Sequence, residues 1–258
     1  MSTVVRSGVR PRALILAAGV GRRLCEKTPE HLQKPKALLE FGGKSLLARH
    51  VDILRGAGIT SITVIIGFLG ETIHSALRGL LDGPPVSVVV NPDFQEGSVV
   101  SLCAGQEVLR TGDPVILMDA DVLYDRRLMT RLLDSALPNC LLVDREIEPG
   151  DEPVKLCVKQ GRIVDFDKRP SVPHEWYGES VGFFRFSAAT AVELADRSKQ
   201  YVASGRRALE YEEPIRDMII AGDPDRFGFE DISGLPWTEI DFPEDVAKAH
   251  ALFPELVE

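Results

Sequence analysis

Residues 13–24 read ALILAAGVGRRL, an apolar run followed by glycines and two adjacent arginines. Residues 13–17 have the length and composition of a short buried strand. Glycines after such a strand let backbone N–H groups approach phosphate oxygens, and arginines supply positive charge. The segment therefore fits a phosphate-binding loop, a dinucleotide fingerprint, or an ordinary tight turn with solvated basic side chains.

Strand and helix patterns alternate along the first half of the chain. β-rich runs are separated by amphipathic runs whose apolar residues recur every three or four positions. We predict strands at 61–66, 86–90, 114–118 and 140–143, and helices from 45 and at 71–81, 98–109 and 126–135. This rhythm indicates an α/β fold with a doubly wound, mostly parallel mixed sheet and helices on both faces.

After residue 150 the pattern changes. KLCVKQGRIVDF (155–166) predicts a hairpin that turns at Gln160-Gly161, and GFFRF (182–186) predicts another strand. Helices follow at about 188–204 and 211–221, then a strand at 237–240 and a helix from Pro243. We predict a single domain over residues 1–258, with a nucleotide-binding half (1–150) and a substrate-shaping half (151–258) that contains a small antiparallel portion.

Composition excludes several classes of partner. Thirty Lys and Arg against 39 Asp and Glu give a net charge of -9, which disfavours nucleic acid and anionic membrane surfaces. The four cysteines show no C-x-x-C spacing, so we expect reduced thiols and no zinc site. No apolar stretch is long enough to span a bilayer, so we predict a cytoplasmic protein without membrane insertion. Assembly as a homo-oligomer stays possible.

Three familiar sequence motifs each lack a residue or a structural context that their function requires. The G-x-G-x-x-G pattern that begins at Gly19 has Leu24 in place of its third glycine. A P-loop ending at Ser45 would need its first glycine at Leu38, so Ser45 is better interpreted as a helix cap. G-x-S-x-G at 178–182 lacks the preceding strand and following helix of a nucleophile elbow.

Asp119 and Asp121 directly follow the predicted strand 114–118. Ligands of parallel sheets bind beyond the carboxyl ends of strands, and aspartates two apart in an extended segment point the same way. Such a pair suits a hard cation such as Mg²⁺. Asp125 is the better candidate for the helix cap, so we predict Asp121 as a metal ligand, with Asp119 as a possible second one.

TEIDFPEDVAKA (238–249) offers a further carboxylate, Asp241, between a short strand and Pro243. Two interpretations are open. With Glu244 three residues on, Asp241 resembles a capping box, and Asp245 suits the first helical turn. Alternatively, Asp241 faces a ligand.

Four ordered segments resemble the nucleotidyltransferases that join a nucleoside triphosphate to a phosphorylated small molecule, a sugar-phosphate and phosphocholine type of family. These segments are LAAGVGRRL (16–24), PKALLEFGGKSLLARHVDIL (35–54), MDADVLYD (118–125) and EIDFPEDVAKAH (239–250). The resemblance implies a Rossmann-like, nucleotide-diphospho-sugar transferase-like fold. It also implies a Mg²⁺-dependent reaction that releases pyrophosphate.

The resemblance assigns roles by position. Arg23 matches the catalytic arginine, and Lys36 matches the phosphate-binding lysine. Asp121 and Asp241 match the Mg²⁺ ligands. The residues expected to bind the nucleotide are Leu16, Ala17, Ala18, Gly19, Gly21, Arg22, Ser98 and Ser101. Arg22 departs from the small hydroxyl residue often found at its position.

NPDFQEGSVVSL (91–102) bears on the choice of nucleotide. Its N-P-x-[FY]-x-x-G-[SN]-x-x-S form resembles cytidylyltransferases, which favours CTP, with Ser98 and Ser101 near the base or ribose. For Ser98, capping of a helix is an equally good interpretation.

HEWYGESVGFF (174–184) bears on the acceptor. Trp176, Tyr177 and Glu179 suit an ammonium head group, or equally core packing. Lys155 and Arg169 are candidates to receive the acceptor's phosphate.

We therefore predict a cytidylyltransferase for phosphocholine, an aminoalkylphosphonate or inositol phosphate, with a CDP- or CMP-linked product. The alternatives are a hexose-1-phosphate nucleotidyltransferase that uses UTP, GTP or dTTP, and a glycosyltransferase of the related fold.

Overall fold

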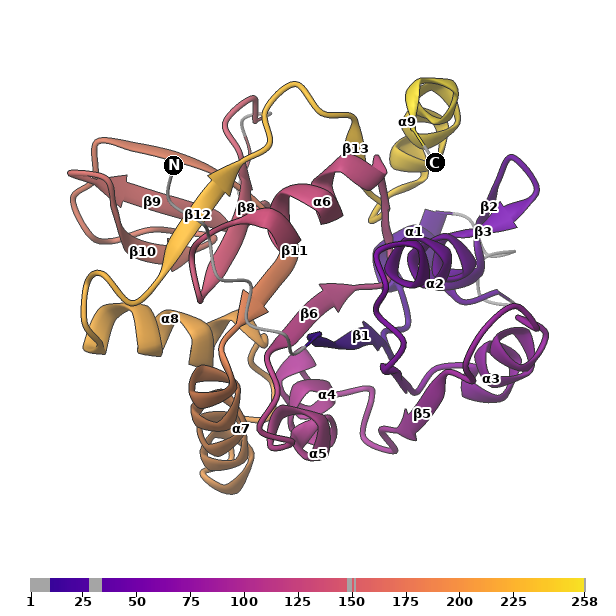
Figure 1. The fold of residues 1–258 in the computed structure, drawn as a ribbon, viewed down its shortest axis with the longest axis horizontal. Helices are drawn as coiled ribbons and strands as arrows, with labels where there is room; N and C mark the ends of the chain where they lie inside the picture. Colours follow the sequence, from indigo (N-terminus) through magenta and orange to yellow (C-terminus); the bar gives the residue numbers. More distant parts are fainter. Residues whose placement is uncertain (1–9, 28–33, 148–149, 151, 258) are drawn as a thin grey trace.

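The computed structural model describes residues 10–27, 34–147, 150 and 152–257. A mixed β-sheet runs through the molecule, and helices cover both its faces (Figure 1). Its parallel part has the order β5-β4-β1-β6. These strands are β1 (Arg12–Ala17), β4 (Ile62–Ile66), β5 (Ser87–Val90) and β6 (Val115–Asp119). The doubly wound, mostly parallel sheet expected from the sequence is confirmed.

Strand β1 occupies the centre because it pairs in parallel with both β4 and β6. Its residues Ala13, Leu14 and Ile15 are completely buried, as expected for a strand covered on both faces. Ala17 is aligned with Ile66, and Leu16 with Asp119. The loops after β1 and β6 therefore leave the sheet at the same edge, where ligands of parallel sheets bind.

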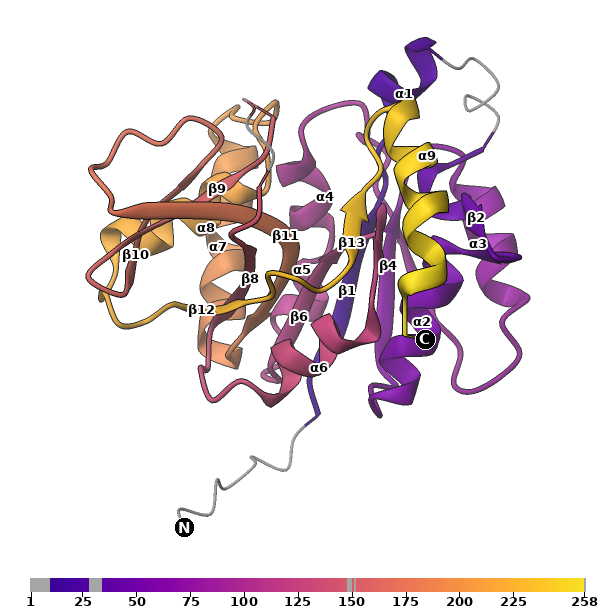
Figure 2. The ribbon, with the colours of Figure 1, turned by 90° about the horizontal axis from the view of Figure 1, so that it is seen from above.

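Helices pack on both faces of this sheet and complete two apolar cores (Figure 2). The first face carries α2 (Leu46–Gly56), α3 (Gly70–Arg78) and α6 (Arg126–Asp134). The second face carries α4 (Ser98–Ala104), α5 (Gln106–Leu109), α7 (Ala188–Ala203) and α8 (Glu212–Ala221). Ser45 caps α2 by accepting a hydrogen bond from the N–H of Ala48, as predicted.

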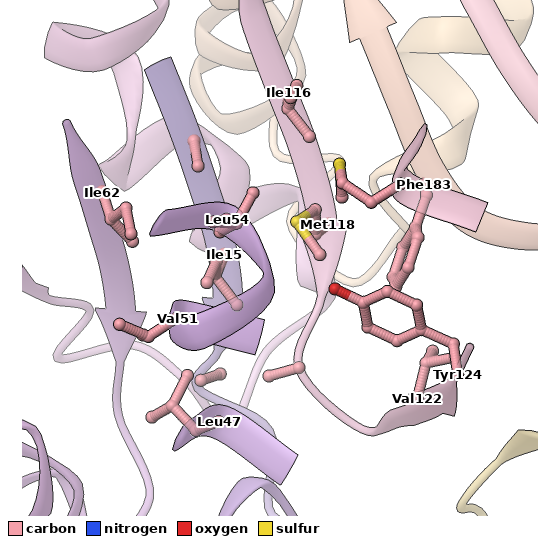
Figure 3. Close-up of a cluster of buried hydrophobic side chains, with 14 of the residues drawn as sticks. Ile15, Leu47, Val51, Leu54, Ile62, Ile116, Met118, Val122, Tyr124 and Phe183 are labelled. Carbon is pink, nitrogen blue, oxygen red and sulfur yellow. The ribbon is translucent and has the colours of Figure 1, made fainter. Parts of the chain in front are cut away.

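The first core joins the two halves of the chain. Figure 3 shows Ile15, Leu54 and Met118 from the first half together with Phe183 from the second. The rings of Tyr124 and Phe183 meet edge to face, with their centroids 4.7 Å apart. The two halves therefore share one core.

The second half extends the same sheet through a long strand, β11 (Trp176–Phe186). Its end pairs antiparallel with β6, and its start pairs with β9 (Lys155–Lys159). The hairpin of β9 and β10 (Arg162–Asp167) turns at Gln160-Gly161, where both residues have positive φ. The strand predicted at 182–186 is thus only the last part of a longer one. β8 (Cys140–Asp144) and β12 (Gly228–Asp231) lie along its other edge.

The helix predicted at 98–109 is broken at Gly105. A Cβ on Gly105 would lie 2.7 Å from Cδ2 of Leu14, so this position packs its backbone directly against β1. The sequence pattern continues across this contact and did not reveal the break.

Several short elements were also not predicted. They are β2 (Glu40–Phe41), β3 (Lys44–Ser45), β7 (Val122–Tyr124), α1 (Arg22–Lys27), η2 (Lys36–Leu38) and η3 (Phe253–Glu255). The predicted strand and helix near the C-terminus are present as β13 (Trp237–Glu239) and α9 (Pro243–Leu252).

Within the described residues, no helix combines the length and the apolar character needed to cross a membrane.

His50 provides a pH-dependent test of this fold. It is completely buried, and burial lowers its pKa to about 3. Its ring nitrogens lie 3.2 Å from the carbonyl oxygen of Leu46 and 3.3 Å from that of Asp119. The unfolded chain binds a proton at this residue below about pH 6.5, whereas the native state does not until about pH 3. Stability is therefore lost as the pH falls through this window.

We expect the free energy of unfolding to fall between pH 7 and pH 5, with about 2 kcal/mol of the loss due to His50. In the variant His50→Gln that part of the loss should disappear, as measured by urea denaturation at both pH values. His174→Gln, at an exposed histidine, is the control and should keep the wild-type difference. Equal pH dependence in wild type and His50→Gln would contradict the assignment.

Candidate active site

A cleft of about 530 Å³ opens at the carboxyl ends of β1 and β6. Residues of both halves of the chain line it. From the predicted set, it contains Leu16, Ala18, Gly19, Gly21, Arg22, Arg23, Lys36, Ser98, Ser101, Asp119, Asp121, Glu179 and Asp241. Residues that are far apart in the sequence thus meet in one site.

The loop after β1 forms one wall of the cleft. Gly21 has φ +66°, and a Cβ there would lie 2.9 Å from Cγ of Lys36. This position therefore needs glycine both for its backbone conformation and for the passage of the lysine side chain. Ala17, the last residue of β1, is buried behind the loop and does not line the cleft.

Lys36 makes the central contact of the site. Its Nζ donates to Oδ2 of Asp121 at 2.6 Å, to Oδ1 of Asp241 at 2.8 Å and to the carbonyl oxygen of Ile240 at 2.8 Å. Burial lowers the pKa of Lys36, but the carboxylates of Asp121 and Asp241 outweigh it and raise the pKa overall. The ammonium group therefore stays charged at neutral pH.

Arg23 lies at the same point of the cleft. One guanidinium nitrogen is 3.1 Å from Oδ2 of Asp241, and another donates to Oε2 of Glu152 at 2.6 Å. Its guanidinium group also lies over the ring of Phe242, 5.3 Å from the centroid. Arg22 is exposed at the rim of the cleft.

The acidic segments are held together by a short pair of strands. β13 pairs antiparallel with β7, and the N–H of Ile240 donates to the carbonyl oxygen of Asp121 at 3.0 Å. This brings Asp121, Glu239 and Asp241 together, with one carboxylate oxygen of each within 4.8 Å of the others. Three hard oxygen donors at this spacing fit a divalent cation such as Mg²⁺.

The alternative role of Asp241 as a helix cap is not the one observed. Oδ2 of Asp245 accepts from the N–H groups of Asp241 and Phe242, at 2.9 and 2.7 Å. Asp245 thereby satisfies the start of α9, and the carboxylate of Asp241 is left to face Lys36 and Arg23. Likewise, Asp125 caps α6 through the N–H of Arg127, as predicted.

Asp119 differs from Asp121 in its surroundings. Oδ2 of Asp119 accepts from the hydroxyl of Tyr211 at 2.6 Å, and Asp119 is not among the three clustered carboxylates. The chain leaves β6 and bends at Ala120, so the alternation of an extended strand does not apply. Burial, the charge of Asp121 and the charge of Glu212 raise the pKa of Asp119.

Ser98 and Ser101 lie at the opposite wall. Ser98 is the first residue of α4, whose N-cap is Gly97, so the interpretation of Ser98 as the cap is wrong. Its Oγ donates to Oε2 of Glu210 at 2.6 Å and accepts from the N–H of Tyr211 at 2.8 Å. Oγ of Ser101 accepts from Nδ2 of the buried Asn91 at 3.0 Å.

Four of the predicted acceptor residues lie outside the cleft: Lys155, Arg169, Trp176 and Tyr177. Nζ of Lys155 donates to the carbonyl oxygens of Gly150 and Lys168, at 2.9 and 2.8 Å.

The two aromatic residues of this set sit near the start of β11. The ring of Trp176 packs against Phe229, with centroids 5.2 Å apart. Because side chains alternate along a strand, Trp176 lies on the face opposite Glu179. Tyr177 is exposed beside His174.

Several lining residues were not predicted. Those with ionisable side chains near the carboxylate cluster or the second half include Glu152, Lys168, Glu210, Tyr211, Glu212 and Glu239. Glu239 is two residues before Asp241 in a strand, a spacing that could have identified it. Burial, Asp121 and Asp241 raise its pKa. For the others, no sequence pattern indicates that their loops reach this cleft.

Comparisons with known proteins agree with this arrangement. Residues 13–165 match the family described as the MobA-like NTP transferase domain. The chain is 32% identical over 250 residues to a bifunctional IPC transferase and DIPP synthase from Rubrobacter xylanophilus, covering 95% of this chain and 52% of the relative. It is 27% identical over 254 residues to a CMP-5'-(3-aminopropyl)phosphonate synthase from Streptomyces rubellomurinus, covering 94% of this chain and 38% of the relative. The chain thus spans about half or less of the length of these relatives.

A solved structure supports the fold. The CTP:phosphocholine cytidylyltransferase from Streptococcus pneumoniae superposes with a TM-score of 0.76 and 23% identity, over 95% of this chain and 100% of that one. The nucleotidyltransferase-like fold expected from the sequence is confirmed.

The cap of α9 gives a test of how Asp241 is held. We expect Asp245→Ala to lower the free energy of unfolding by about 1 kcal/mol, because two N–H groups lose their acceptor. Asp82→Ala, at an exposed aspartate outside the helices, serves as the comparison and should cost clearly less. Urea denaturation of both variants measures the difference, and equal losses would contradict the role given to Asp245.

Proposed function

The chain belongs to the family of MobA-like NTP transferase domains, and on this basis we propose that it is a cytidylyltransferase. It would transfer the CMP group of CTP to a small phosphorylated or phosphonate acceptor and release pyrophosphate. The observation that carries the proposal is the contact of Lys36 with Asp121 and Asp241 beside the glycine-rich loop. It supports the proposal because cations and carboxylates, the groups that would hold a triphosphate and its metal ion, lie together at the edge of the sheet where ligands of parallel sheets bind.

Two lines support CTP as the donor. Residues 91–101 have the form found in cytidylyltransferases, and Ser98 and Ser101 of this segment line the cleft. The relative named as a CMP-aminopropylphosphonate synthase and the fold neighbour named as a CTP:phosphocholine cytidylyltransferase point the same way. The main alternative remains a hexose-1-phosphate nucleotidyltransferase that uses another triphosphate.

The reaction is a displacement at phosphorus. An acceptor oxygen, already anionic, attacks the α-phosphorus of CTP, the bond to the β-phosphate oxygen breaks, and pyrophosphate leaves with the bonding electrons. No strong general base is needed, and the obstacle is repulsion between two anions. Arg23, Lys36 and the N–H groups of the loop around Gly19 and Gly21 would hold both reactants and offset the charge that develops on pyrophosphate.

Mg²⁺ is proposed as the cofactor. Asp121, Glu239 and Asp241 together offer three hard oxygen donors of the kind that a divalent cation prefers, and Lys36 and Arg23 contact two of these residues. Asp121 and Asp241 would hold the ion, with Glu239 as a further candidate ligand. When bound, Mg²⁺ supplies neutralisation of phosphate charge. Asp119 is a weaker candidate because its carboxylate is bonded to Tyr211.

We assign nucleotide binding to residues 1–150 and acceptor binding to residues 151–258. The cleft receives its glycine-rich loop from the first part and Glu179, Tyr211 and Glu212 from the second. From the sequence we also propose that the protein acts in the cytoplasm. Assembly as a homo-oligomer is compatible with this proposal.

The choice of donor is tested by measuring pyrophosphate release with Mg²⁺ and each common triphosphate, in the presence of phosphocholine, aminoethylphosphonate, inositol phosphate or glucose 1-phosphate. We expect release with CTP and a phosphate or phosphonate acceptor. Release that depends on UTP, GTP or dTTP and a hexose phosphate would favour the alternative. Absence of pyrophosphate with every pair would refute the proposed function.

Two variants test the assigned groups. We expect Lys36→Ala and Asp121→Asn each to reduce kcat by about 10²–10³-fold, because each removes charge from the reacting phosphates or their cation. Lys44→Ala and Asp82→Asn are matched exposed controls outside the cleft and should keep wild-type rates. Near-normal turnover in either test variant would remove that residue from the mechanism.

A further inference from the structure

The wall of the cleft that faces the second half of the chain is strongly acidic. Asp119 ends β6, Glu179 lies on β11, and Glu210 and Glu212 flank Tyr211 at the start of α8. The cations that line the cleft among the described residues are Arg22, Arg23, Lys36 and Lys168. Arg23 and Lys36 already contact the carboxylates of Asp241 and Asp121, and Nζ of Lys168 lies 3.8 Å from Glu152. This acidic wall therefore has more carboxyl groups than nearby cations.

Among the residues of the acidic wall, Glu212 gives the most specific indication of a ligand. Its Oε2 is shielded from solvent and has no hydrogen-bond partner among the described residues. Burial, with a contribution from Glu210, raises the pKa of Glu212 to about 8. A buried carboxyl oxygen without a partner is costly, so its presence on a cleft wall suggests a donor that arrives with the ligand.

The neighbours of Glu212 indicate what kind of donor this is. The charge of Glu212 acts on Asp119 and on Glu239, and the charge of Glu210 acts on Glu212. A hydroxyl group could satisfy one oxygen, but only a cation would also favour the ionised form of Glu212, which burial and Glu210 disfavour in the free protein.

We propose that the acceptor carries an ammonium group, primary or quaternary, on the same small molecule as its phosphate or phosphonate, and that Glu212 is its main counter-charge. This inference rests on the proposed function and narrows its acceptor class. The anionic end of such an acceptor would face Arg23 and Lys36, and its cationic end the acidic wall. A polyol or sugar phosphate would lack the charge that this wall needs.

Three acceptors of matched length test the proposal with CTP and Mg²⁺: 2-aminoethylphosphonate, 2-hydroxyethylphosphonate and propylphosphonate. They end in an ammonium, a hydroxyl and a methyl group. We expect kcat/KM for the ammonium compound to exceed that of each other compound by at least about 100-fold, because a site built for a polar partner rejects analogues that lack it. Equal values for the ammonium and hydroxyl compounds would overturn the proposal while pyrophosphate release still supported the proposed function.

Glu212→Gln then tests the counter-charge. It should lower kcat/KM for 2-aminoethylphosphonate by at least about 10-fold, mainly through KM, and leave that for propylphosphonate nearly unchanged. Glu213→Gln, the next residue on α8 and outside the cleft, is the matched control and should behave as wild type. An equal loss with both acceptors would overturn the role of Glu212 as a counter-charge.

A second cation site is the competing explanation of the acidic wall. It predicts that Glu212→Gln raises the Mg²⁺ concentration needed for half-maximal rate without changing the preference among the three acceptors, and that result would overturn the proposal. The thermal midpoint of Glu212→Gln should not fall, since the substitution keeps the shape and replaces a buried carboxyl group that has no hydrogen-bond partner for one of its oxygens. If the variant fails to fold, the three acceptors compared on the wild-type protein still decide.

Discussion

One ammonium group holds the site together. Nζ of Lys36 contacts carboxylates 85 and 205 positions away in the chain, so it joins the loop region, the end of β6 and the start of α9. Two carboxylates this close would repel one another without a cation between them. The same charge that stabilises the acidic cluster also lies where the proposed triphosphate must bind. Stability and the proposed phosphate binding therefore depend on the same side chain.

The helix caps make this contact possible. The carboxylate of an aspartate at the start of a helix normally accepts hydrogen bonds from backbone N–H groups. Here Asp125 and Asp245 take that role for α6 and α9, a few residues after Asp121 and Asp241. The earlier aspartate of each pair is then left to contact Lys36. Each segment thus contains one carboxylate for folding and one for the site.

The sequence predicts the nucleotide side of the molecule well. Apolar runs that end in glycine or aspartate locate β1 and β6, and parallel pairing then requires their ends to meet. These arguments depend on local periodicity and on the rule that parallel strands share a ligand-binding edge. They identify Gly21 and Asp121, whereas the roles of Lys36 and Asp241 follow only from the family resemblance; the structure brings all four residues together.

The acceptor side is less predictable for physical reasons. Which face a strand residue occupies depends on where the strand begins, and β11 begins six residues before the predicted start at 182. Trp176 therefore turns away from Glu179 and packs on Phe229. Glu210 and Glu212 reach the cleft because the loop before α8 packs on α4, with Gly97 against the backbone of Leu209. Such long-range contacts leave no periodic signal in the chain.

Strand β11 has a consequence for how this protein can diverge. Residues 176–179 pair with β9, residues 183–186 pair with β6, and the register shifts between Ser180 and Phe184. At Gly182, φ is +75°, and a Cβ would lie 2.2 Å from Oδ2 of Asp119, so a larger residue is excluded at this junction. We expect changes at Glu179 and Ser180, which line the cleft before this glycine, to alter the proposed acceptor site, while changes at Val181 or at residues 183–186 disturb the core. Substitutions that change the acceptor specificity should therefore occur mainly in the part of β11 that precedes Gly182.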